Sequence, residues 1–321
     1  MKAIVYHRYG SADELKLVEM PKPVPADDQV LIKIHAVSIN GSDREGLVGR
    51  PLYARIGGLF RPGAAILGSD IAGRVEVVGN NHTEFKVGDE VFGEIPGYGG
   101  GFAEYICTHA KTMTIKPAGL SFEEAAAIPQ AGVIALNGIV KQGNVQAGQH
   151  VLINGAGGSG GTFAVQLAKF HGAEVTGVDN TNKLDFMRSL GADHVIDYTR
   201  EDFTKNGKQY DLILDLIARR SARAYQRALR PDGQYFLVGG SVATMLNVLL
   251  MGASIKKRTG KKVNILMVPQ NRKDLIAITE LCTSGKVRPV IDRQYSLDQV
   301  PQAMRYVSDG QSKGKVIITV P

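Results

Sequence analysis

One short stretch limits the possible folds of this chain more than any other, a glycine-rich turn between an apolar run and an amphipathic segment. Glycines occupy positions 155, 157, 158, 160 and 161, after Val151–Ile153 and before Thr162–His171, where apolar residues recur at helical spacing. The pattern predicts a buried strand, a tight turn and a helix. Because glycine lacks a Cβ atom, a pyrophosphate can approach this backbone, and the unpaired N–H groups that begin the helix can bind its oxygens.

A second apolar run, Val175–Val178, ends on Asp179, about 20 residues beyond the glycines as in dinucleotide-binding sequences. A carboxylate at such a strand end can accept hydrogen bonds from the ribose hydroxyls of an adenosine. The stretch is therefore interpreted as a dinucleotide-binding turn. Its register stays open at this point, because the working glycines are either 155, 157 and 160 or 155, 158 and 161.

The rest of the chain separates into two kinds of sequence. Residues before about 120 contain short β runs bounded by proline, glycine and aspartate, without alternating helices, and predict a mostly β domain. From Val151 onward strands alternate with helices, which is typical of a parallel sheet covered on both faces, with VNILMV (263–268) as a sixth strand. The predicted α/β fold thus has a mostly β domain (1–121), a doubly wound domain (122–270) and a C-terminal segment that returns to the first domain (271–321).

Composition excludes several classes of protein. The 321 residues are 44% apolar and 21% charged, and the net charge of +7 is spread along the chain without the aromatic and basic interleaving of nucleic-acid binders. The start of the chain lacks the apolar core of a signal peptide. The two cysteines, Cys107 and Cys282, are far apart and belong to no motif, which indicates a reducing compartment, so we expect a cytoplasmic protein.

One apolar run needs a separate interpretation. Val242–Met251 precedes a basic cluster at residues 256–262, but the run is too short to span a membrane and is broken by polar residues. We expect a buried helix followed by a solvated loop. No stable membrane association is predicted.

Several segments, in this order along the chain, resemble a known superfamily. They are SINGSDR (38–44), LGSDIAGRVEVVG (67–79), VGDEVFGE (87–94), AAAIPQAGVIAL (125–136), the glycine turn, LGADHVIDY (190–198) and GKVIITV (314–320). The sequence is similar to the medium-chain dehydrogenase/reductase superfamily, and most closely to its zinc-independent quinone oxidoreductase, or zeta-crystallin-like, branch. The resemblance covers nearly the whole chain. It implies a GroES-like catalytic domain, a Rossmann domain and an NAD(P)H-dependent enzyme.

The chain departs from the zinc-dependent alcohol dehydrogenases of that superfamily at the metal. Those enzymes hold zinc with a cysteine, a histidine–glutamate pair and a further cysteine or aspartate, where this sequence has Asn40, Ser69 with Asp70, and Ala131. Zinc prefers thiolate and imidazole ligands in a tetrahedron. The two isolated cysteines and the seven scattered histidines do not supply such a set. We therefore expect no metal.

Without a Lewis acid, the oxidation of a simple alcohol loses its main electrostatic aid, whereas a conjugated acceptor spreads the arriving charge itself. The expected reaction is hydride transfer from NAD(P)H to a quinone or to an α,β-unsaturated carbonyl. Asn40, in place of the lost cysteine, and Tyr53, in the following loop, are the predicted catalytic residues. The Asn40 amide and the Tyr53 hydroxyl would stabilise the developing oxyanion, and Tyr53 could also deliver a proton.

The resemblance also assigns the cofactor site. It gives Asp179 and Lys183 to the adenosine ribose with Tyr198 beside them. Asp179 would repel the 2′-phosphate of NADPH, whereas Lys183 and Tyr198 would favour it, so NADPH and NADH both stay open. The remaining assigned residues are Gly155, Ala156, Gly157, Gly158, Ser159, Gly160 and Gly161 at the pyrophosphate, and Leu216, Val238 and Gly239 at the nicotinamide half.

Three other functions stay open from the sequence. They are an alcohol dehydrogenase, an enoyl-thioester reductase of the same fold, and a non-enzymatic nucleotide-binding or structural protein. The resemblance further implies assembly, since superfamily members commonly join two subunits along the sheet edge. We expect a homodimer through the sixth strand, which would otherwise present an open edge.

Overall fold

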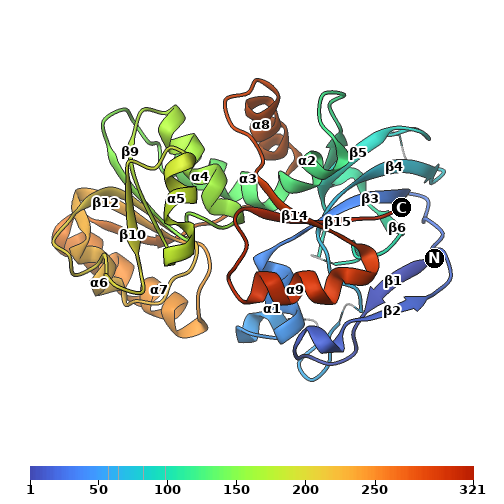
Figure 1. Ribbon diagram of the computed structural model, residues 1–321, viewed down its shortest axis with the longest axis horizontal. Coiled ribbons are helices and arrows are strands. Elements are labelled where there is room, and N and C mark those ends of the chain that lie inside the picture. Colours follow the sequence, from blue (N-terminus) through green and yellow to red (C-terminus); the bar gives the residue numbers. More distant parts are fainter. Residues whose placement is uncertain (57, 64, 82, 98) are drawn as a thin grey trace. The chain divides into compact units, whose positions relative to one another are not determined.

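The computed structural model describes residues 1–56, 58–63, 65–81, 83–97 and 99–321 (Figure 1). The chain divides into two compact units. Unit 1 comprises Met1–Gln130, Gln270–Thr283 and Pro289–Pro321, and unit 2 comprises Ala131–Pro269 and Ser284–Arg288. The predicted domain ranges 1–121, 122–270 and 271–321 stay a prediction. The two units differ from them mainly at residues 122–130, which belong to unit 1.

Unit 1 is built on a mostly antiparallel sheet. In the described ranges it has seven strands, in the order β14-β15-β3-β4-β5-β7 with β6 also paired to β3, while β1 and β2 form a separate antiparallel pair. The C-terminal strand β15 lies beside β3, as Figure 1 shows in red and blue, so the last segment completes a sheet begun near the N-terminus. The strands are β1 (Lys2–Val5), β2 (Lys16–Glu19), β3 (Val30–Ile39), β4 (Asp70–Val78), β5 (Glu90–Glu94), β6 (Tyr105–Thr108), β7 (Met113–Ile115), β14 (Ile291–Ser296) and β15 (Lys315–Thr319).

Short helices cover this sheet, and one of them begins at a capping box. The Ser121 hydroxyl accepts a hydrogen bond from the Glu124 N–H at 3.1 Å, and the Glu124 carboxylate accepts one from the Ser121 N–H at 2.9 Å. The helix that follows, α2, buries its three alanines completely. The helices of unit 1 are α1 (Gly41–Val48), α2 (Phe122–Ala127), α8 (Arg272–Thr283) and α9 (Val300–Ser308), with single turns η1 (Ala12–Glu14), η2 (Leu52–Arg55), η3 (Ala110–Thr112) and η6 (Leu297–Gln299).

Unit 2 contains the predicted parallel sheet. Its strands run in the order β10-β9-β8-β11-β12-β13 and pair only in parallel within the described residues, which confirms the doubly wound class. The apolar run Val151–Ile153 lies fully buried at the centre of the sheet. The strands are β8 (His150–Asn154), β9 (Glu174–Asp179), β10 (His194–Asp197), β11 (Tyr210–Asp215), β12 (Leu229–Leu237) and β13 (Lys262–Ile265), the predicted sixth strand.

Helices lie on both faces of this sheet. Figure 1 shows α4 and α5 on one face and α6 and α7 on the other, the arrangement that strand–helix alternation predicts. Helix α3 spans the boundary between the two units. The helical segments are α3 (Pro129–Ala135), the π-helical turn η4 (Leu136–Lys141), α4 (Ser159–Phe170), η5 (Thr181–Lys183), α5 (Leu184–Ser189), α6 (Ala222–Arg227) and α7 (Val242–Thr259).

The expectation of a buried helix followed by a solvated loop was wrong on two points, because α7 is exposed along one face and its helix continues to Thr259. The helix was predicted to be buried, but Leu246, Leu249 and Leu250 are 52%, 62% and 77% exposed. Their spacing places them on one outward face, because residues three and four apart share a side of a helix. The helix also continues through Lys256, Lys257 and Arg258, where cations near the C-terminal end complement the helix dipole. None of the described helices combines the length and apolar character needed to cross a membrane.

Candidate functional site

Unit 2 brings the sequence-predicted cofactor residues to one edge of its sheet. In a parallel sheet all strands end at the same edge, and nucleotides bind beyond those carboxyl ends. The glycine turn follows β8, and Asp179 ends β9. The other predicted residues follow the remaining strands at this edge: Tyr198 follows β10, Leu216 follows β11, and Val238 and Gly239 follow β12.

The geometry of the glycine turn bears on its register. Gly155 has φ of +86°, a conformation that favours glycine. A Cβ at Gly161 would lie 2.2 Å from the Gly155 carbonyl oxygen, so the helix packs there directly against the strand end. Gly158 caps α4, and a Cβ on it would meet only that same oxygen, at 3.4 Å. Dinucleotide-binding turns need one glycine for the tight turn, one where the backbone approaches the pyrophosphate and one where the helix packs against the strand. Gly155, Gly158 and Gly161 fit these roles in that order, which favours this register over the one with 157 and 160.

Asp179 is held in an ion pair at the end of β9. Its Oδ2 accepts a hydrogen bond from the Gly157 N–H at 3.1 Å, and its Oδ1 accepts one from the Asn180 N–H at 2.9 Å. The Lys183 ammonium lies 3.5 Å from Oδ1, and both side chains are 7% exposed. The carboxylate that would repel a 2′-phosphate is thus already paired with a cation. Tyr198, by contrast, is 51% exposed, and its backbone N–H donates a hydrogen bond to the Asp179 carbonyl at 3.1 Å.

A buried aspartate supports the same edge, and the sequence analysis missed it. Asp215 is fully buried at the end of β11, where its Oδ1 accepts hydrogen bonds from Asn154 Nδ2 at 2.7 Å and from the Ile217 N–H at 3.1 Å. Its Oδ2 accepts the Tyr235 hydroxyl at 3.0 Å, and burial raises its pKa. Asp215 therefore ties the residue before the glycine turn to the neighbouring strands. The available signal was the single charge of Asp215 within the apolar run LILDLI (212–217).

Unit 1 contains a second polar site, centred on Asn40. This residue follows β3, begins α1 and is buried. Its Oδ1 accepts a hydrogen bond from Lys315 Nζ at 2.7 Å, and its Nδ2 donates one to Ser69 Oγ at 3.2 Å. Because an ammonium can only donate hydrogen bonds, the Asn40 oxygen, and not its nitrogen, must face Lys315. Lys315 and Asp70 are both fully buried, with Lys315 Nζ 3.6 Å from Asp70 Oδ2.

Two more carboxyl groups lie in this cluster. Asp43 accepts hydrogen bonds from the Asn40 N–H at 2.7 Å and from the Gly68 N–H at 2.9 Å, and burial raises its pKa to about 7. Glu94, on β5, is the strand partner of Asp70 on β4. Burial, aided by the charge of Asp70, raises the pKa of Glu94 to about 7. Burial also raises the pKa of Asp70 and lowers that of Lys315.

Tyr53, the other predicted catalytic residue, lies in η2. Its hydroxyl donates a hydrogen bond to Glu45 Oε2 at 3.0 Å, and burial raises the pKa of Tyr53. Both effects oppose release of the phenolic proton to a substrate. In the same loop Arg55 donates a hydrogen bond to the Gly49 carbonyl and its guanidinium lies 4.6 Å from the centre of the Tyr9 ring, contacts that hold the loop together.

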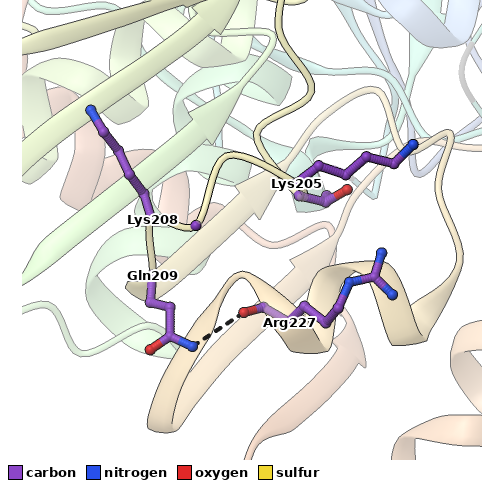
Figure 2. A pocket seen from close by; sticks show the side chains of 6 residues that line it. Lys205, Lys208, Gln209 and Arg227 are labelled. Atoms are coloured by element: carbon purple, nitrogen blue, oxygen red, sulfur yellow. Dashed lines mark hydrogen bonds between the residues drawn. The ribbon is translucent and has the colours of Figure 1, made fainter.

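Two other features of the described residues bear on the choice of site. In the described part of the chain, no group of three or more His, Cys, Asp or Glu residues is arranged to hold a metal. His82, one of the histidines judged unable to ligate zinc, lies outside the described residues. A surface pocket of about 470 Å³ is lined by residues that precede β11 and β12, at the amino edge of the sheet rather than the carboxyl edge. Figure 2 shows the side chains that line it. The lining residues are Thr204, Lys205, Gly207, Lys208, Gln209 and Arg227.

A GroES-like sheet unit and a doubly wound unit with a dinucleotide-type edge define a dehydrogenase-class protein. Residues 26–118 match the alcohol dehydrogenase GroES-like domain, and residues 190–318 match the zinc-binding dehydrogenase family. A 2-methylene-furan-3-one reductase of Solanum lycopersicum is 36% identical over 331 residues, 99% of this chain and 79% of that protein. The chain belongs to the medium-chain dehydrogenase/reductase superfamily, in its quinone oxidoreductase branch.

Two further comparisons agree with this assignment. A chloroplastic NADPH-dependent alkenal/one oxidoreductase of Arabidopsis thaliana is 31% identical over 331 residues, again 99% of this chain and 79% of that protein. The solved structure of a quinone oxidoreductase from Coxiella burnetii has a TM-score of 0.88 and 29% identity, and the match covers 100% of this chain and 99% of that one.

The expected cytoplasmic location is contradicted by the comparisons. The Arabidopsis relative is named chloroplastic, and a Danio rerio relative, 31% identical, is named a mitochondrial NAD(P)H oxidoreductase. The prediction rested on two unpaired cysteines. Free thiols indicate an environment in which they stay reduced, and this does not distinguish the cytosol from the interior of an organelle.

Proposed function

We propose that this chain reduces quinones or α,β-unsaturated carbonyl compounds with NAD(P)H, without zinc. The observation that carries the proposal is the glycine turn at the carboxyl edge, followed by Asp179 and Lys183 at the next strand end. Relatives named as a quinone oxidoreductase, an alkenal/one oxidoreductase, a 2-methylene-furan-3-one reductase and an NAD(P)H oxidoreductase support it.

The cofactor residues follow from that edge. The turn from Gly155 to Gly161 would hold the pyrophosphate, chiefly through the N–H groups of Ser159, Gly160 and Gly161 that begin α4. Those of Gly155, Ala156, Gly157 and Gly158 already donate within the protein. Asp179, Lys183 and Tyr198 would lie at the adenosine ribose, and Leu216, Val238 and Gly239 at the nicotinamide. The fit rests on the open approach at Gly158, where a Cβ would meet no atom closer than 3.4 Å. When bound, NAD(P)H supplies the hydride. Because Lys183 already offsets the charge of Asp179, we propose that NADPH is accepted as well as NADH.

The absence of zinc is proposed from the chemistry of the donors. Asn40 and Asp70 occupy positions that match metal ligands in the zinc enzymes, and the ammonium of Lys315 already contacts Asn40 Oδ1 at 2.7 Å. A divalent cation beside this buried ammonium would be repelled by it. Elemental analysis of the purified protein tests this proposal, and stoichiometric zinc would favour the alcohol dehydrogenase alternative.

Asn40 is proposed as the main group of unit 1 that stabilises negative charge on the acceptor oxygen, with a smaller contribution from Tyr53, whose hydroxyl already donates to Glu45. The contacts of Asn40 support a polarised amide, because its oxygen accepts from an ammonium while its nitrogen donates. Replacing Asn40 with alanine tests the role, since unaltered turnover would remove it from the catalytic residues. The matched control is Asn80→Ala, a change at an exposed asparagine that hydrogen-bonds Asp27.

The direct test of the function is a substrate panel. Wild-type protein with NADH or NADPH should reduce quinones and enones and leave simple alcohols and ketones nearly unchanged. Dissociation constants for both cofactors, measured by fluorescence, give binding independently of turnover. Cofactor binding without turnover on any quinone or enone would instead favour a non-enzymatic role.

We also propose that the chain forms a homodimer through β13. Within the described residues this strand pairs only with β12, so one edge of the sheet is open. Helix α7 packs against β13 and exposes Leu246, Leu249 and Leu250. Open strand edges and exposed apolar patches are both features that a second subunit covers. Sedimentation analysis should give twice the chain mass of 34.5 kDa, and a monomer at micromolar concentration would contradict the proposal.

A further inference from the structure

The buried cluster of unit 1 has more acidic than basic groups. Lys315 Nζ lies 3.6 Å from Asp70 Oδ2, and the charges of Asp70, Asp43 and Glu94 all act on its pKa, opposing the effect of burial. Full ionisation would leave an excess of negative charge away from water, which is costly, so the cluster retains protons near neutral pH. In addition, Asp70 Oδ1 is buried and has no hydrogen-bond partner among the described residues. The cluster is therefore a store of protons rather than a set of fixed charges.

Glu94 is the member of this cluster that reaches solvent. Asp43, Asp70 and Lys315 are buried, whereas Glu94, the last residue of β5, is partly exposed. A proton leaving the cluster for a small molecule can therefore do so from the Glu94 carboxyl group, and solvent can replace it there.

Gln130 holds Glu94 in place. Its Nε2 donates a hydrogen bond to Glu94 Oε1 at 2.7 Å, and its Oε1 accepts one from Ser42 Oγ at 3.2 Å, which fixes the direction of the amide. The backbone N–H of Gln130 also donates to Asp70 Oδ2 at 3.1 Å. Gln130 thus positions the carboxyl groups of both Glu94 and Asp70. Its side-chain amide contacts Oε1 of Glu94 and not Oε2.

We propose that Glu94 is the general acid of this enzyme, which protonates the α-carbon of an enone after hydride addition. The inference rests on the proposed function and names a residue that sequence analysis did not assign. Hydride addition to the β-carbon moves the C=C electron pair toward oxygen as an enolate, while the nicotinamide is oxidised. The enolate then forms a C–H bond at the α-carbon as the Glu94 O–H bond breaks. The resulting carboxylate takes a proton from water, which closes the cycle.

The pH dependence follows from the groups that face Glu94. Asp70 on β4 disfavours its ionised form, whereas Lys315 on β15 and the amides of Gln130 and Gln270 favour it, and burial is the largest influence. The outcome is a pKa of about 7. The acid form is the active one, so turnover of an enone should be highest at low pH and fall as pH rises through about 7. An acid with a pKa near the working pH is well suited to proton transfer.

Glu94→Gln tests the proposal, because it keeps the size and the hydrogen-bonding capacity of the side chain and removes its acidity. Turnover of an α-substituted enone should fall about 100-fold, within the usual range for loss of a general acid. Reduction of a quinone should change by less than about threefold, because the oxygens of a hydroquinone take protons directly from water while carbon is protonated slowly. The decline in enone turnover above about pH 7 should also disappear.

A stereochemical measurement separates proton delivery from a structural effect. In D₂O the wild type should place deuterium on one face of the α-carbon, and Glu94→Gln should give both faces. Glu94→Asp keeps an acid and should retain the facial preference at lower turnover. Glu76→Gln, which removes an exposed carboxylate on β4 that pairs with Lys22, is the control and should match wild type.

The role of Glu94 and the proposed oxidoreductase function would be overturned by different results. Equal losses on enone and quinone, or an unchanged facial preference in Glu94→Gln, would overturn the role of Glu94 and leave the oxidoreductase function intact. A wild-type protein that reduces no quinone or enone with either cofactor would overturn both.

Discussion

The two polar regions of this molecule are built in opposite ways. The cofactor edge of unit 2 is formed largely by backbone within the short segment from Gly155 to Asp179, and its main requirement is the absence of side chains. The cluster of unit 1 is formed by side chains from the start of α1 and from β4, β5 and β15, and the contact between Asn40 and Lys315 joins residues 275 positions apart. Steric changes should therefore damage the first region, and changes of charge the second.

Lys315→Met should produce the largest effect on stability. Removing the ammonium leaves Asp70 fully buried without its cation, and breaking a buried ion pair typically costs 3–5 kcal/mol. We expect a loss of about 3 kcal/mol in the free energy of unfolding at pH 8. Urea denaturation followed by circular dichroism measures it.

The pH dependence of that loss identifies its cause. Burial raises the pKa of Asp70, and without Lys315 the pKa should rise further, so Asp70 takes up a proton as pH falls and the cost becomes smaller. The destabilisation should therefore be smaller at pH 5.5 than at pH 8. Adding Asp70→Asn to Lys315→Met should recover part of the loss at pH 8. A loss that is the same at both pH values would point to packing rather than charge.

Gly161→Ala and Gly158→Ala should separate the two glycine registers. A Cβ at Gly161 would lie 2.2 Å from the Gly155 carbonyl, so the helix must shift, and we expect about 1–3 kcal/mol of destabilisation, as for other overpacked sites. Gly158→Ala should change stability by less than about 1 kcal/mol, since the position has room and an extended backbone. It should nevertheless weaken NADPH binding about tenfold by obstructing the pyrophosphate.

Thermal unfolding and cofactor titration measure these two effects separately. Gly160→Ala is a useful companion, because a Cβ there would make only ordinary contact at 3.5 Å with Leu216. If Gly160→Ala weakened binding and Gly158→Ala did not, the register with Gly157 and Gly160 would be the correct one.

The same contrast explains how much could be predicted from the sequence. The glycine turn, Asp179 and the strand–helix alternation are local patterns, and the structure confirms the fold class they predicted. Lys315, Glu94 and Asp215 were missed, because their importance depends on burial and on partners far away in the chain. The exposed face of α7 was also mispredicted. An apolar run shows that its residues are hydrophobic, but the sequence does not show whether another element packs against them.

Asp179→Ser should shift cofactor preference by a smaller amount. The change removes the partner of Lys183 and leaves its ammonium available to a 2′-phosphate, so NADPH should gain about tenfold in affinity relative to NADH, about 1.4 kcal/mol. Equilibrium titration with both cofactors gives the ratio. A marked preference of the wild type for NADPH that Asp179→Ser leaves unchanged would show that this aspartate does not control the choice.

Tyr53→Phe should have the smallest effect of these variants, and it tests whether Tyr53 or Glu94 delivers the proton. The hydroxyl donates to Glu45, whose own pKa is raised by burial, so its loss should cost about 1 kcal/mol of stability, as for a single hydrogen bond. Enone turnover should stay within about threefold of wild type, because a tyrosine whose pKa is raised and whose proton is already shared is a poor acid. Steady-state kinetics beside Glu94→Gln decides between the two residues. Only the residue that delivers the proton controls which face of the α-carbon receives it. A loss of about 100-fold in Tyr53→Phe, with deuterium on both faces of the product, would therefore identify Tyr53 rather than Glu94 as the proton donor.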